Sequence, residues 1–354
     1  MNPVANSHWI CAEGKQGRLR LITILLFKAP HLVLRRLPEY QGVFREFFYC
    51  PHAAPATVMS MTTPAGRYAP SPSGDLHIGN LRTALAAWLD ARAAGRRFLL
   101  RIEDVDEQRS SREVARRQLE HLAAIGIDWD GEPVYQQDRY GLYERALARL
   151  DTFPCYCSRK DIREAARAPH TPPSFYPGTC IDRTDIPDMG DRSPAVRFHG
   201  GGEMTIVDDL HGTVTGPVDH CVLRRGGREP GWAYNLACVV DDCKQGVDRV
   251  VRGEDLLSSA PTQAAIATAL GATPPTYLHV PLVVGEDGER LAKRNGATTL
   301  PELARTWSIP EIVGMLGRSL GIEGAETARD MVARYSPQAI PTRPWEFSAP
   351  GGQK

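Results

Sequence analysis

The sequence predicts an α/β fold built on a doubly wound, Rossmann-like parallel sheet. From residue 63 to about residue 150, short strand-like apolar segments alternate with segments that have helical spacing. A proline-rich stretch with few long apolar segments follows, and strand-like segments then return from residue 205 onward. Two βα halves separated by an insertion are the pattern of such a sheet.

The first half is expected to hold two strands and three helices. A strand at residues 67–69 leads through a turn rich in Pro and Gly into a helix that opens near His77, because apolar residues then recur at helical spacing. The same patterns predict a strand over residues 96–102 and helices over residues 112–124 and 140–150.

The second half follows a proline-rich stretch, residues 151–204, which we interpret as an insertion. Strand-like segments that would complete the sheet lie at residues 205–207, 218–223, 232–240 and 247–251, followed by a helix over 261–270. A short helix is predicted at 310–320, before a polar tail. The expected division is therefore 63–150 and 205–300 for the two catalytic halves, 151–204 for the insertion and 301–354 for a short helical stub and tail.

The first 62 residues fit neither half. They show no clear period and no small-residue cleavage site of the secretory kind, and Met59 and Met61 lie directly before the first strand. We expect residues 1–62 to be an N-terminal extension, either disordered or the product of a start codon assigned too far upstream. A mature chain that begins at Met1 would argue against the second explanation.

Composition excludes some classes of function. Lys+Arg and Asp+Glu both number 42, so the global charge does not indicate a nucleic-acid binder, and any RNA contact must rest on local patches. No apolar run reaches the ~18–20 residues that a membrane span requires. The eight cysteines occur without an export signal, which favours reduced thiols in a cytoplasmic protein.

The run from Arg67 to Arg82 predicts a site for anionic groups. A strand, a Gly-containing turn and a helix N-terminus follow one another here, so unpaired backbone N–H groups and the positive end of the helix dipole would face a ligand. His77 would add an imidazole donor for phosphate oxygens, and Gly79 would let a nucleotide approach the backbone.

This run, with His-Ile-Gly-Asn at residues 77–80 after Ala-Pro-Ser-Pro-Ser-Gly, resembles the "HIGH" signature of class I aminoacyl-tRNA synthetases of the glutamyl/glutaminyl branch. The resemblance implies a class I synthetase fold, ATP binding by His77 and Gly79, and catalytic roles for His77 and Asn80. Asn80 stands where the second His of the signature would be, and its amide can still donate a hydrogen bond.

Further runs resemble the glutamyl family in the expected order: Arg101-Ile-Glu-Asp-Val-Asp106, Trp232-Ala-Tyr-Asn-Leu236, Val239-Val-Asp-Asp242 and Val251-Arg-Gly-Glu-Asp255. Glutamate has one ammonium and two carboxylates, so a selective pocket needs an anion and at least one forked guanidinium. By positional match, Arg67 and Arg252 would bind carboxylate, Glu103 the α-amino group, and Tyr234 and Ser71 other polar atoms. The resemblance extends the L-glutamate site to Tyr68, Ala69 and Pro70.

Arg290-Leu-Ala-Lys-Arg294 stands at the place of the "KMSKS" loop of class I synthetases. Lys293 matches the position that stabilises charge on departing pyrophosphate, and therefore joins the predicted ATP-binding and catalytic residues, with Mg²⁺ beside the phosphates. Ala292 and Arg294 depart from the family pattern, which puts loop closure and rate in question.

Cys155, Cys157 and Cys180 have a short-then-long spacing that suits one structural, tetrahedral Zn²⁺. Chemistry alone favours His170 as fourth ligand, because a neutral imidazole binds zinc without losing a proton, whereas a phenol must be deprotonated. The pattern Cys-x-Cys…Tyr-x-x-x-Cys resembles the zinc site of the synthetase relatives, which implies Tyr176 instead.

Only 61 residues follow Lys293, too few for the ~100–150-residue anticodon-binding domain of a full glutamyl-tRNA synthetase. The chain therefore resembles the glutamyl-queuosine tRNA(Asp) synthetases. That resemblance implies tRNA-independent activation of L-glutamate with ATP and transfer of the glutamyl group to queuosine in the anticodon of tRNA(Asp), by a monomer without membrane contact. The alternatives are a truncated synthetase for tRNA(Glu), a small-molecule adenylyltransferase and a catalytically idle RNA-binding paralogue.

Overall fold

The computed structural model describes most of the 354-residue chain, namely residues 7–13, 19–25, 63–158, 160–162, 175–289, 291 and 298–348. The chain divides into two units, residues 1–60 and 61–354. In the first unit, β1 (Ser7–Glu13) and β2 (Leu19–Leu25) pair as antiparallel strands where the sequence predicted no element. The rest of the predicted extension lies outside the described residues, so its disorder stays a prediction.

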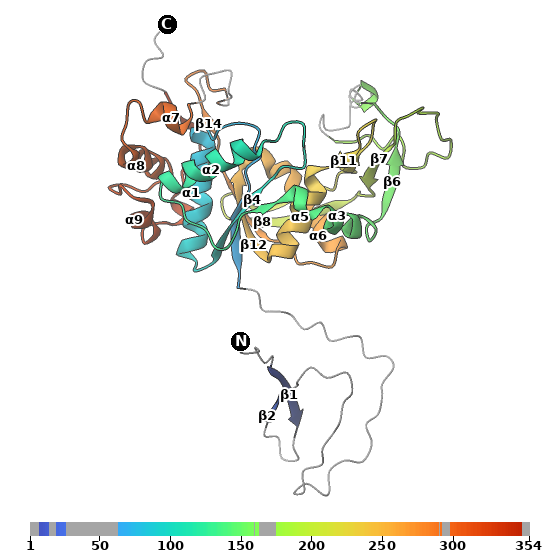
Figure 1. Ribbon diagram of the computed structural model, residues 1–354, viewed down its shortest axis with the longest axis horizontal. Coiled ribbons are helices and arrows are strands. Elements are labelled where there is room, and N and C mark those ends of the chain that lie inside the picture. The colour runs from blue at the N-terminus through green and yellow to red at the C-terminus, as the bar shows by residue number, and fades with distance from the viewer. Residues whose placement is uncertain are drawn as a thin grey trace, which may run out of the picture. The chain divides into compact units, whose positions relative to one another are not determined.

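A seven-stranded sheet forms the body of the second unit (Figure 1). Its order is β5-β4-β3-β12-β13-β8-β9, and all neighbours are parallel except β8 and the edge strand β9. The strands are β3 (Ala65–Tyr68), β4 (Arg97–Ile102), β5 (Val134–Tyr135), β8 (Glu203–Asp208), β9 (Gly212–Pro217), β12 (Val247–Gly253) and β13 (Thr276–Val280). The order reverses between β3 and β12, as in a doubly wound sheet. The predicted α/β sheet is confirmed, with one antiparallel edge.

One face of the sheet is covered by α1 (Ile78–Ala93), α2 (Arg112–Ala124), α8 (Ile309–Ser319) and α9 (Ala328–Val332) (Figure 1). Leu81 and Leu85 of α1 are fully buried in this core, as the helical spacing predicted. α1 packs closely on β3, because a Cβ at Gly66 would lie only 3.1 Å from the Cβ of Ala91. The first turn of α1 is thereby held at the carboxyl end of β3.

The opposite face carries α3 (Tyr140–Leu147), α5 (Tyr234–Gln245) and α6 (Ala260–Ala269), with the short 3-10 helices η1 (Gln136–Arg139) and η2 (Glu254–Ser259). The prediction of a strand at 232–240 is wrong, because the residues from Tyr234 onward form the first part of α5. A short apolar run cannot be told from a buried helix by its period alone. α5 ends at Gly246, whose φ of 71° is the left-handed conformation that glycine adopts without strain.

A second, four-stranded sheet stands beside the main one. It has the order β11-β10-β7-β6 and is antiparallel throughout, with β6 (Thr152–Cys155), β7 (Ala195–Phe198), β10 (Val222–Arg225) and β11 (Gly231–Trp232). The segment 218–223 was predicted to complete the main sheet, and β10 joins this smaller sheet instead. Sheet membership therefore does not follow the predicted insertion limits of 151–204, and those domain limits stay a prediction.

The C-terminal part contains α7 (Leu300–Leu303), α8, α9, the 3-10 helix η3 (Pro337–Ala339) and a parallel pair of β14 (Val283–Val284) with β15 (Trp345–Glu346). The predicted helix at 310–320 corresponds to α8. The residues beyond it are more structured than the predicted polar tail, because Met331 and Phe347 are buried in the main core. No helix in the described part of the chain is long and apolar enough to cross a membrane.

Candidate active site

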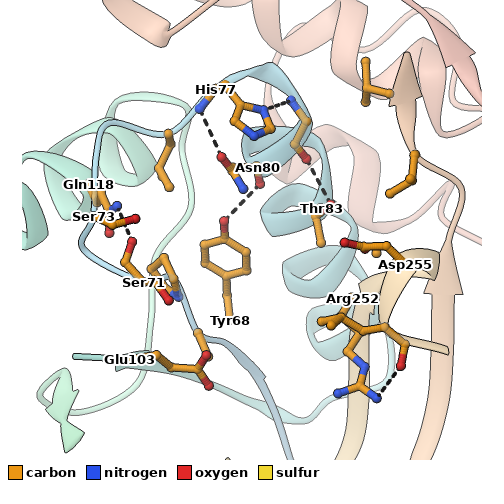
Figure 2. Close-up of a pocket in the computed structure, with 18 of the residues that line it drawn as sticks. Tyr68, Ser71, Ser73, His77, Asn80, Thr83, Glu103, Gln118, Arg252 and Asp255 are labelled. Carbon is orange, nitrogen blue, oxygen red and sulfur yellow. Dashed lines mark hydrogen bonds between the residues drawn. The ribbon is translucent and has the colours of Figure 1, made fainter. Parts of the chain in front are cut away.

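A cleft of about 670 Å³ opens at the carboxyl ends of β3, β4 and β12. Its walls come from the turn after β3, the first turn of α1, Glu103 beyond β4, Tyr234 at the start of α5 and the segment after β12 (Figure 2). The cleft lies where the strand order reverses, which is the position at which open α/β sheets bind ligands.

The predicted substrate residues, which the sequence places on four separate segments, all line this one cleft. They are Arg67, Tyr68, Ala69, Pro70, Ser71, Glu103, Tyr234 and Arg252, together with His77, Gly79 and Asn80 of the signature. Lys293 and its neighbours Arg290, Ala292 and Arg294 lie outside the described residues, so their roles stay predictions.

The first turn of α1 is closed by its own residues, contrary to the expectation of unpaired backbone donors. The Nδ1 atom of His77 accepts the backbone N–H of Gly79 at 3.1 Å, and Asn80 Oδ1 accepts the backbone N–H of His77 at 3.2 Å. The backbone N–H of Ile78 donates to the carbonyl of Thr298 at 3.0 Å. This capping box fixes the imidazole at the helix N-terminus and leaves the helix dipole, rather than unpaired N–H groups, to attract an anion.

The described residues on either side of the gap in the predicted "KMSKS" segment, Leu291 and Thr299, lie near this turn. Leu291 lines the cleft and donates its backbone N–H to the carbonyl of Val283 at 3.2 Å. On the other side, Thr299 forms an isolated bridge with His77. The structure therefore places the flanks of the segment beside the predicted ATP site.

Arg67 is fixed by a buried ion cluster beneath the cleft. Asp242 Oδ1 accepts from Arg67 Nε at 3.2 Å and from Arg101 Nη1 at 2.6 Å. Arg101 Nη2 also donates to Glu103 Oε1 at 3.2 Å, so two guanidinium groups and two carboxylates form one network. All four side chains are at least nine-tenths buried, which makes the network rigid and strongly coupled.

The two carboxylates of this cluster differ in their pKa. Burial alone would raise the pKa of Asp242, but Arg101 and Arg67 hold it below its usual value. Burial raises the pKa of Glu103, and the same two arginines only partly offset this. Glu103 therefore has less cationic compensation than Asp242, and an ammonium group in the cleft would stabilise its charged form.

Two phenols complete the polar wall. Tyr68 donates its hydroxyl to the carbonyl of Asn80 at 3.2 Å (Figure 2). Burial, then Glu103, raises the pKa of Tyr68, and burial, then Cys238, raises that of Tyr234. Both phenols therefore remain neutral hydrogen-bond donors at neutral pH.

Arg252 lies across the cleft and is only 5% exposed. Its guanidinium donates to Gln263 Oε1 at 2.7 Å, to His279 Nε2 at 3.0 Å and to the carbonyl of Leu256 at 3.2 Å. Sequence reasoning did not find these supporting residues, nor Asp242 as the carboxylate that Arg67 shares with Arg101. A buried Asp inside the apolar run of α5 was the one available sign, because a buried carboxylate needs a cation.

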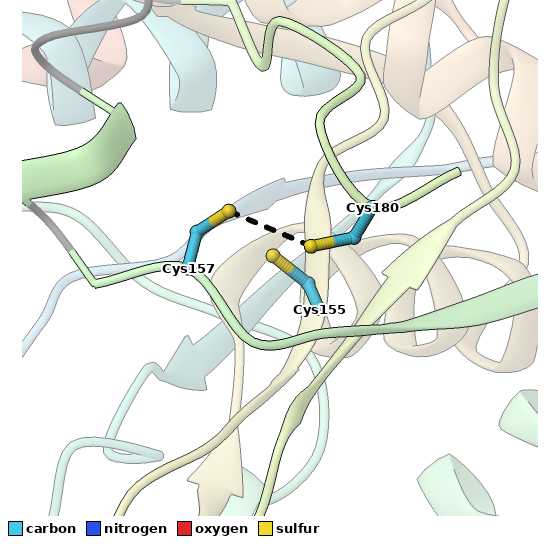
Figure 3. Close-up of side chains that lie close together, drawn as sticks. All are labelled: Cys155, Cys157 and Cys180. Carbon is cyan, nitrogen blue, oxygen red and sulfur yellow. Dashed lines mark hydrogen bonds between the residues drawn. The ribbon is translucent and has the colours of Figure 1, made fainter. Parts of the chain in front are cut away.

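Beside the four-stranded sheet, Cys155, Cys157 and Cys180 bring their sulfur atoms within 4.8 Å of one another (Figure 3). Tyr176 Oη lies 3.4 Å from the Cys155 sulfur and 3.6 Å from the Cys157 sulfur, and the Cys157 and Cys180 sulfurs are 3.5 Å apart. His170 lies outside the described residues.

These donor atoms fit a tetrahedral metal site. A zinc ion with Zn–S bonds of about 2.3 Å places its sulfur ligands roughly 3.8 Å from one another and a ligating oxygen roughly 3.5 Å from each sulfur. The observed separations of Tyr176 Oη match the oxygen vertex of such a tetrahedron. The Tyr176 hydroxyl oxygen also accepts the backbone N–H of Cys180 at 2.9 Å, which would favour a phenolate.

Arg197 lies beside this cluster and would offset part of the negative charge of a metal-bound state. Its guanidinium carbon lies 3.7 Å from the centre of the Tyr176 ring, and the side chain is only 5% exposed. Burial would raise the pKa of Cys180, but hydrogen bonds, first of all with Tyr176, lower it to about 7. Sequence reasoning did not find Arg197 as a neighbour of this cluster.

Comparisons with known proteins agree with this architecture. Residues 65–316 match the family model of the class I tRNA synthetases (E and Q), catalytic domain. The chain is 53% identical to a glutamyl-Q tRNA(Asp) synthetase of Nocardia farcinica, over 79% of this chain and 92% of the relative. It is 39% identical to a glutamate–tRNA ligase 1 of Acidithiobacillus ferrooxidans, over 77% of this chain and 61% of the relative.

Among solved structures, the glutamate-tRNA synthetase of Elizabethkingia anophelis has the same fold. The TM-score is 0.68 at 22% identity, over 81% of this chain and 68% of that one. Fold, family model and relatives together define a class I aminoacyl-tRNA synthetase-like ligase. Within that class, the chain belongs to the glutamyl-Q tRNA(Asp) synthetase family.

Proposed function

We propose that this ligase activates L-glutamate with ATP, without requiring tRNA, and transfers the glutamyl group to queuosine in the anticodon of tRNA(Asp). In the first step, a glutamate α-carboxylate oxygen attacks the α-phosphorus of ATP, and pyrophosphate leaves. In the second, a queuosine hydroxyl attacks the acyl carbon of the adenylate, and AMP leaves. The observation that carries the proposal is that one cleft contains two buried guanidinium groups, Arg67 and Arg252, together with the carboxylate of Glu103.

Glutamate fits the charges of this cleft. Glu103 would receive the α-ammonium group, and Arg252, whose protein partners are all neutral, would receive the side-chain carboxylate by a forked pair of hydrogen bonds. Arg67 is held in place by Asp242 and would add a second guanidinium contact. Tyr68, Tyr234 and the Ala69–Ser71 turn would bind the remaining polar atoms.

The ATP phosphates fit the first turn of α1. The dipole of this sixteen-residue helix favours negative charge at His77, and we expect the imidazole to meet phosphate through Nε2, because Nδ1 accepts the helix cap. A side chain at Gly79 would crowd the imidazole, since its Cβ would lie 3.0 Å from His77 Cε1. Mg²⁺ and Lys293 would spread the charge of departing pyrophosphate. The protein would therefore act by positioning and electrostatics.

The choice of acceptor rests on the relatives. Those with 53% and 46% identity are named glutamyl-Q tRNA(Asp) synthetase, a name that specifies tRNA(Asp). A second candidate, glutamylation of tRNA(Glu), is favoured by the 39% identity to a glutamate–tRNA ligase. The greater similarity to the first group makes tRNA(Asp) our proposal.

We also propose that Cys155, Cys157, Tyr176 and Cys180 hold one structural Zn²⁺. The ion would fix the loop that carries Tyr176 and Cys180 against the end of β6. Because the cysteine cluster is built on the smaller sheet and not on the walls of the cleft, the metal would take no part in bond making.

The test is a pair of assays on the purified chain. Glutamate-dependent ATP–pyrophosphate exchange without tRNA should be positive, and aspartate and glutamine should give little exchange. Labelled glutamate should then be transferred to tRNA(Asp) that carries queuosine and not to the same tRNA without it. Transfer to tRNA(Glu) instead would support the second candidate. Absence of both exchange and transfer would contradict the proposal and favour a catalytically idle RNA-binding paralogue or a small-molecule adenylyltransferase with another substrate.

A further inference from the structure

Arg252 is connected to a buried chain of two side chains behind the cleft. Its Nε lies 3.0 Å from His279 Nε2, and His279 Nδ1 lies 2.7 Å from Asp208 Oδ2. His279 and Asp208 are fully buried beneath the substrate wall, and only Arg252 lines the cleft. The three residues come from the neighbouring strands β12, β13 and β8, so the sheet itself sets their spacing.

This geometry permits one protonation state of His279. A guanidinium is always protonated, so Arg252 Nε–H must donate and His279 Nε2 must accept. The ring proton then lies on Nδ1 and is donated to Asp208. Burial, the largest influence, lowers the pKa of His279 and keeps the ring neutral.

Asp208 is itself fixed. Its Oδ2 also accepts the backbone N–H of His279 at 2.9 Å, and its Oδ1 accepts the backbone N–H groups of Leu210 and His211, both at 3.0 Å. Burial would raise its pKa, but His279 and these donors lower it to about 2. A permanently ionised, immobile carboxylate therefore sets the tautomer and orientation of the imidazole.

The two cleft arginines differ in the charge of their partners. Arg67 shares Asp242 with Arg101, so much of its charge is balanced inside the protein. The three acceptors of Arg252 are an imidazole, an amide and a backbone carbonyl, all neutral. These bonds use three of its five N–H groups. They fix the orientation of the guanidinium group, but none of the acceptors neutralises its charge.

We propose that His279, held by Asp208 as the neutral Nδ1–H tautomer, is a positioning residue that aims Arg252 at the side-chain carboxylate of the substrate without cancelling its charge. The inference rests on the proposed glutamate activation. A carboxylate in place of the imidazole would hold Arg252 equally well and would repel the substrate. The neutral acceptor is therefore what makes a buried arginine selective for an acidic side chain.

The test compares His279→Leu, which removes the acceptor, with His279→Gln, whose amide oxygen can replace Nε2. In pyrophosphate exchange we expect His279→Leu to raise the KM for glutamate about 10- to 100-fold, because a buried donor loses its partner. His279→Gln should stay within about threefold of the wild type. The kcat and the KM for ATP should change by less than about twofold in both variants, since the ATP site is built on α1.

Tyr277→Phe is the matched control. Tyr277 stacks on His279 with ring centroids 5.6 Å apart, so the variant alters the same buried region and leaves the three-residue chain intact. Its KM for glutamate should equal that of the wild type. A wild-type KM in His279→Leu, an equal loss in His279→Gln, or a parallel loss for glutamate and ATP would each overturn the inference.

A second measurement separates this inference from the proposed function. In ¹⁵N-histidine NMR of the full chain, the His279 ring should carry its proton on Nδ1, and Arg252→Ala should shift the Nε2 resonance. If the wild type shows no exchange, the proposed function fails, and the NMR result still decides whether Arg252 is held as described. A ring protonated on Nε2, or unaffected by Arg252→Ala, would contradict the positioning role. The same measurement decides the matter if His279→Leu does not fold.

Discussion

The cleft and the cysteine cluster solve the problem of buried charge in different ways. In the cleft, cations lie against acceptors supplied by the chain: Arg67 and Arg101 against Asp242, and Arg252 against neutral groups. In the cluster, four electron-rich donor atoms converge on one another, an arrangement that a bound cation would stabilise. The shape of the cleft is therefore set by the protein, while that of the cluster would be set by a bound metal.

The largest expected effect follows from removing the cation that faces the cleft. Arg252→Ala should lower kcat/KM for glutamate on the order of 1,000-fold, because a buried carboxylate loses a charge-assisted partner worth about 3–5 kcal/mol. Arg252→Lys keeps the charge and loses the fork, so it should be intermediate. Exchange kinetics measure both, with Arg96→Ala, whose half-exposed pair with Asp248 lies outside the cleft, as control. Unchanged exchange in Arg252→Ala would contradict the proposed glutamate site.

The next largest effect concerns the anion that the other two arginines share. Asp242→Asn should reduce the free energy of unfolding by about 3 kcal/mol, because two buried guanidinium groups lose their common counter-ion. Urea denaturation measures this loss. Asp128→Asn, at a half-exposed pair with Arg92, should cost less than about 1 kcal/mol. An equal loss of unfolding free energy in the two variants would show that the buried ion pairs of Asp242 stabilise the fold no more than an exposed pair does.

Loss of the metal should destabilise the cysteine cluster and leave the activity of the cleft nearly unchanged. We expect about one zinc per chain by elemental analysis, and Cys180→Ser should lower both that content and the thermal stability. Because the cluster is not part of the cleft wall, glutamate exchange by the folded fraction should fall less than about threefold. His170→Ala should retain the metal, whereas Tyr176→Phe should weaken its binding. The reverse result would make the imidazole the fourth ligand.

The smallest effect at neutral pH concerns the pH dependence of the free energy of unfolding. The unfolded chain binds protons at Asp208 and His279 more readily than the folded chain, since both pKa values are lowered by folding. Stability from His279 is therefore full above about pH 6.5 and decreases as the pH falls. Stability from Asp208 is full above about pH 4 and is lost as the pH falls towards 2, a total of about 2 kcal/mol. Denaturation of Asp208→Asn as a function of pH should lack the lower transition.

Local patterns predicted what local interactions determine. The start of the helix near His77, the turn before it and the apolar spacing of α1 are all encoded within a few neighbouring residues, and the structure has them as expected. The capping of the helix by the His77 and Asn80 side chains was not predicted. The run at 232–240 failed, because a segment buried among other helices has no polar face to reveal its period. The resemblance to known synthetases supplied Arg67 and Arg252, yet gave no indication of the acceptors that hold them.

Those acceptors come from elements far away in the chain. Arg67 meets Asp242 across 175 positions, and Arg82 of α1, which the sequence gave no reason to bury, donates to the backbone carbonyl of Ser319 across 237 positions. Such pairings depend on which strands become neighbours, and that order is fixed by the packing of the whole sheet. The N-terminal strands β1 and β2 were missed for a simpler reason, since their segments show no clear alternation.

The pairing of β3 with β12 has a consequence during protein synthesis. The strand that carries Arg67 leaves the ribosome early, and its partner strand emerges only after the whole intervening segment has been translated. Until then, one edge of β3 is open to pairing with other nascent chains. We therefore expect translation products that stop before Val247 to aggregate, and ligand protection against proteolysis to arise only once Val280 has been added.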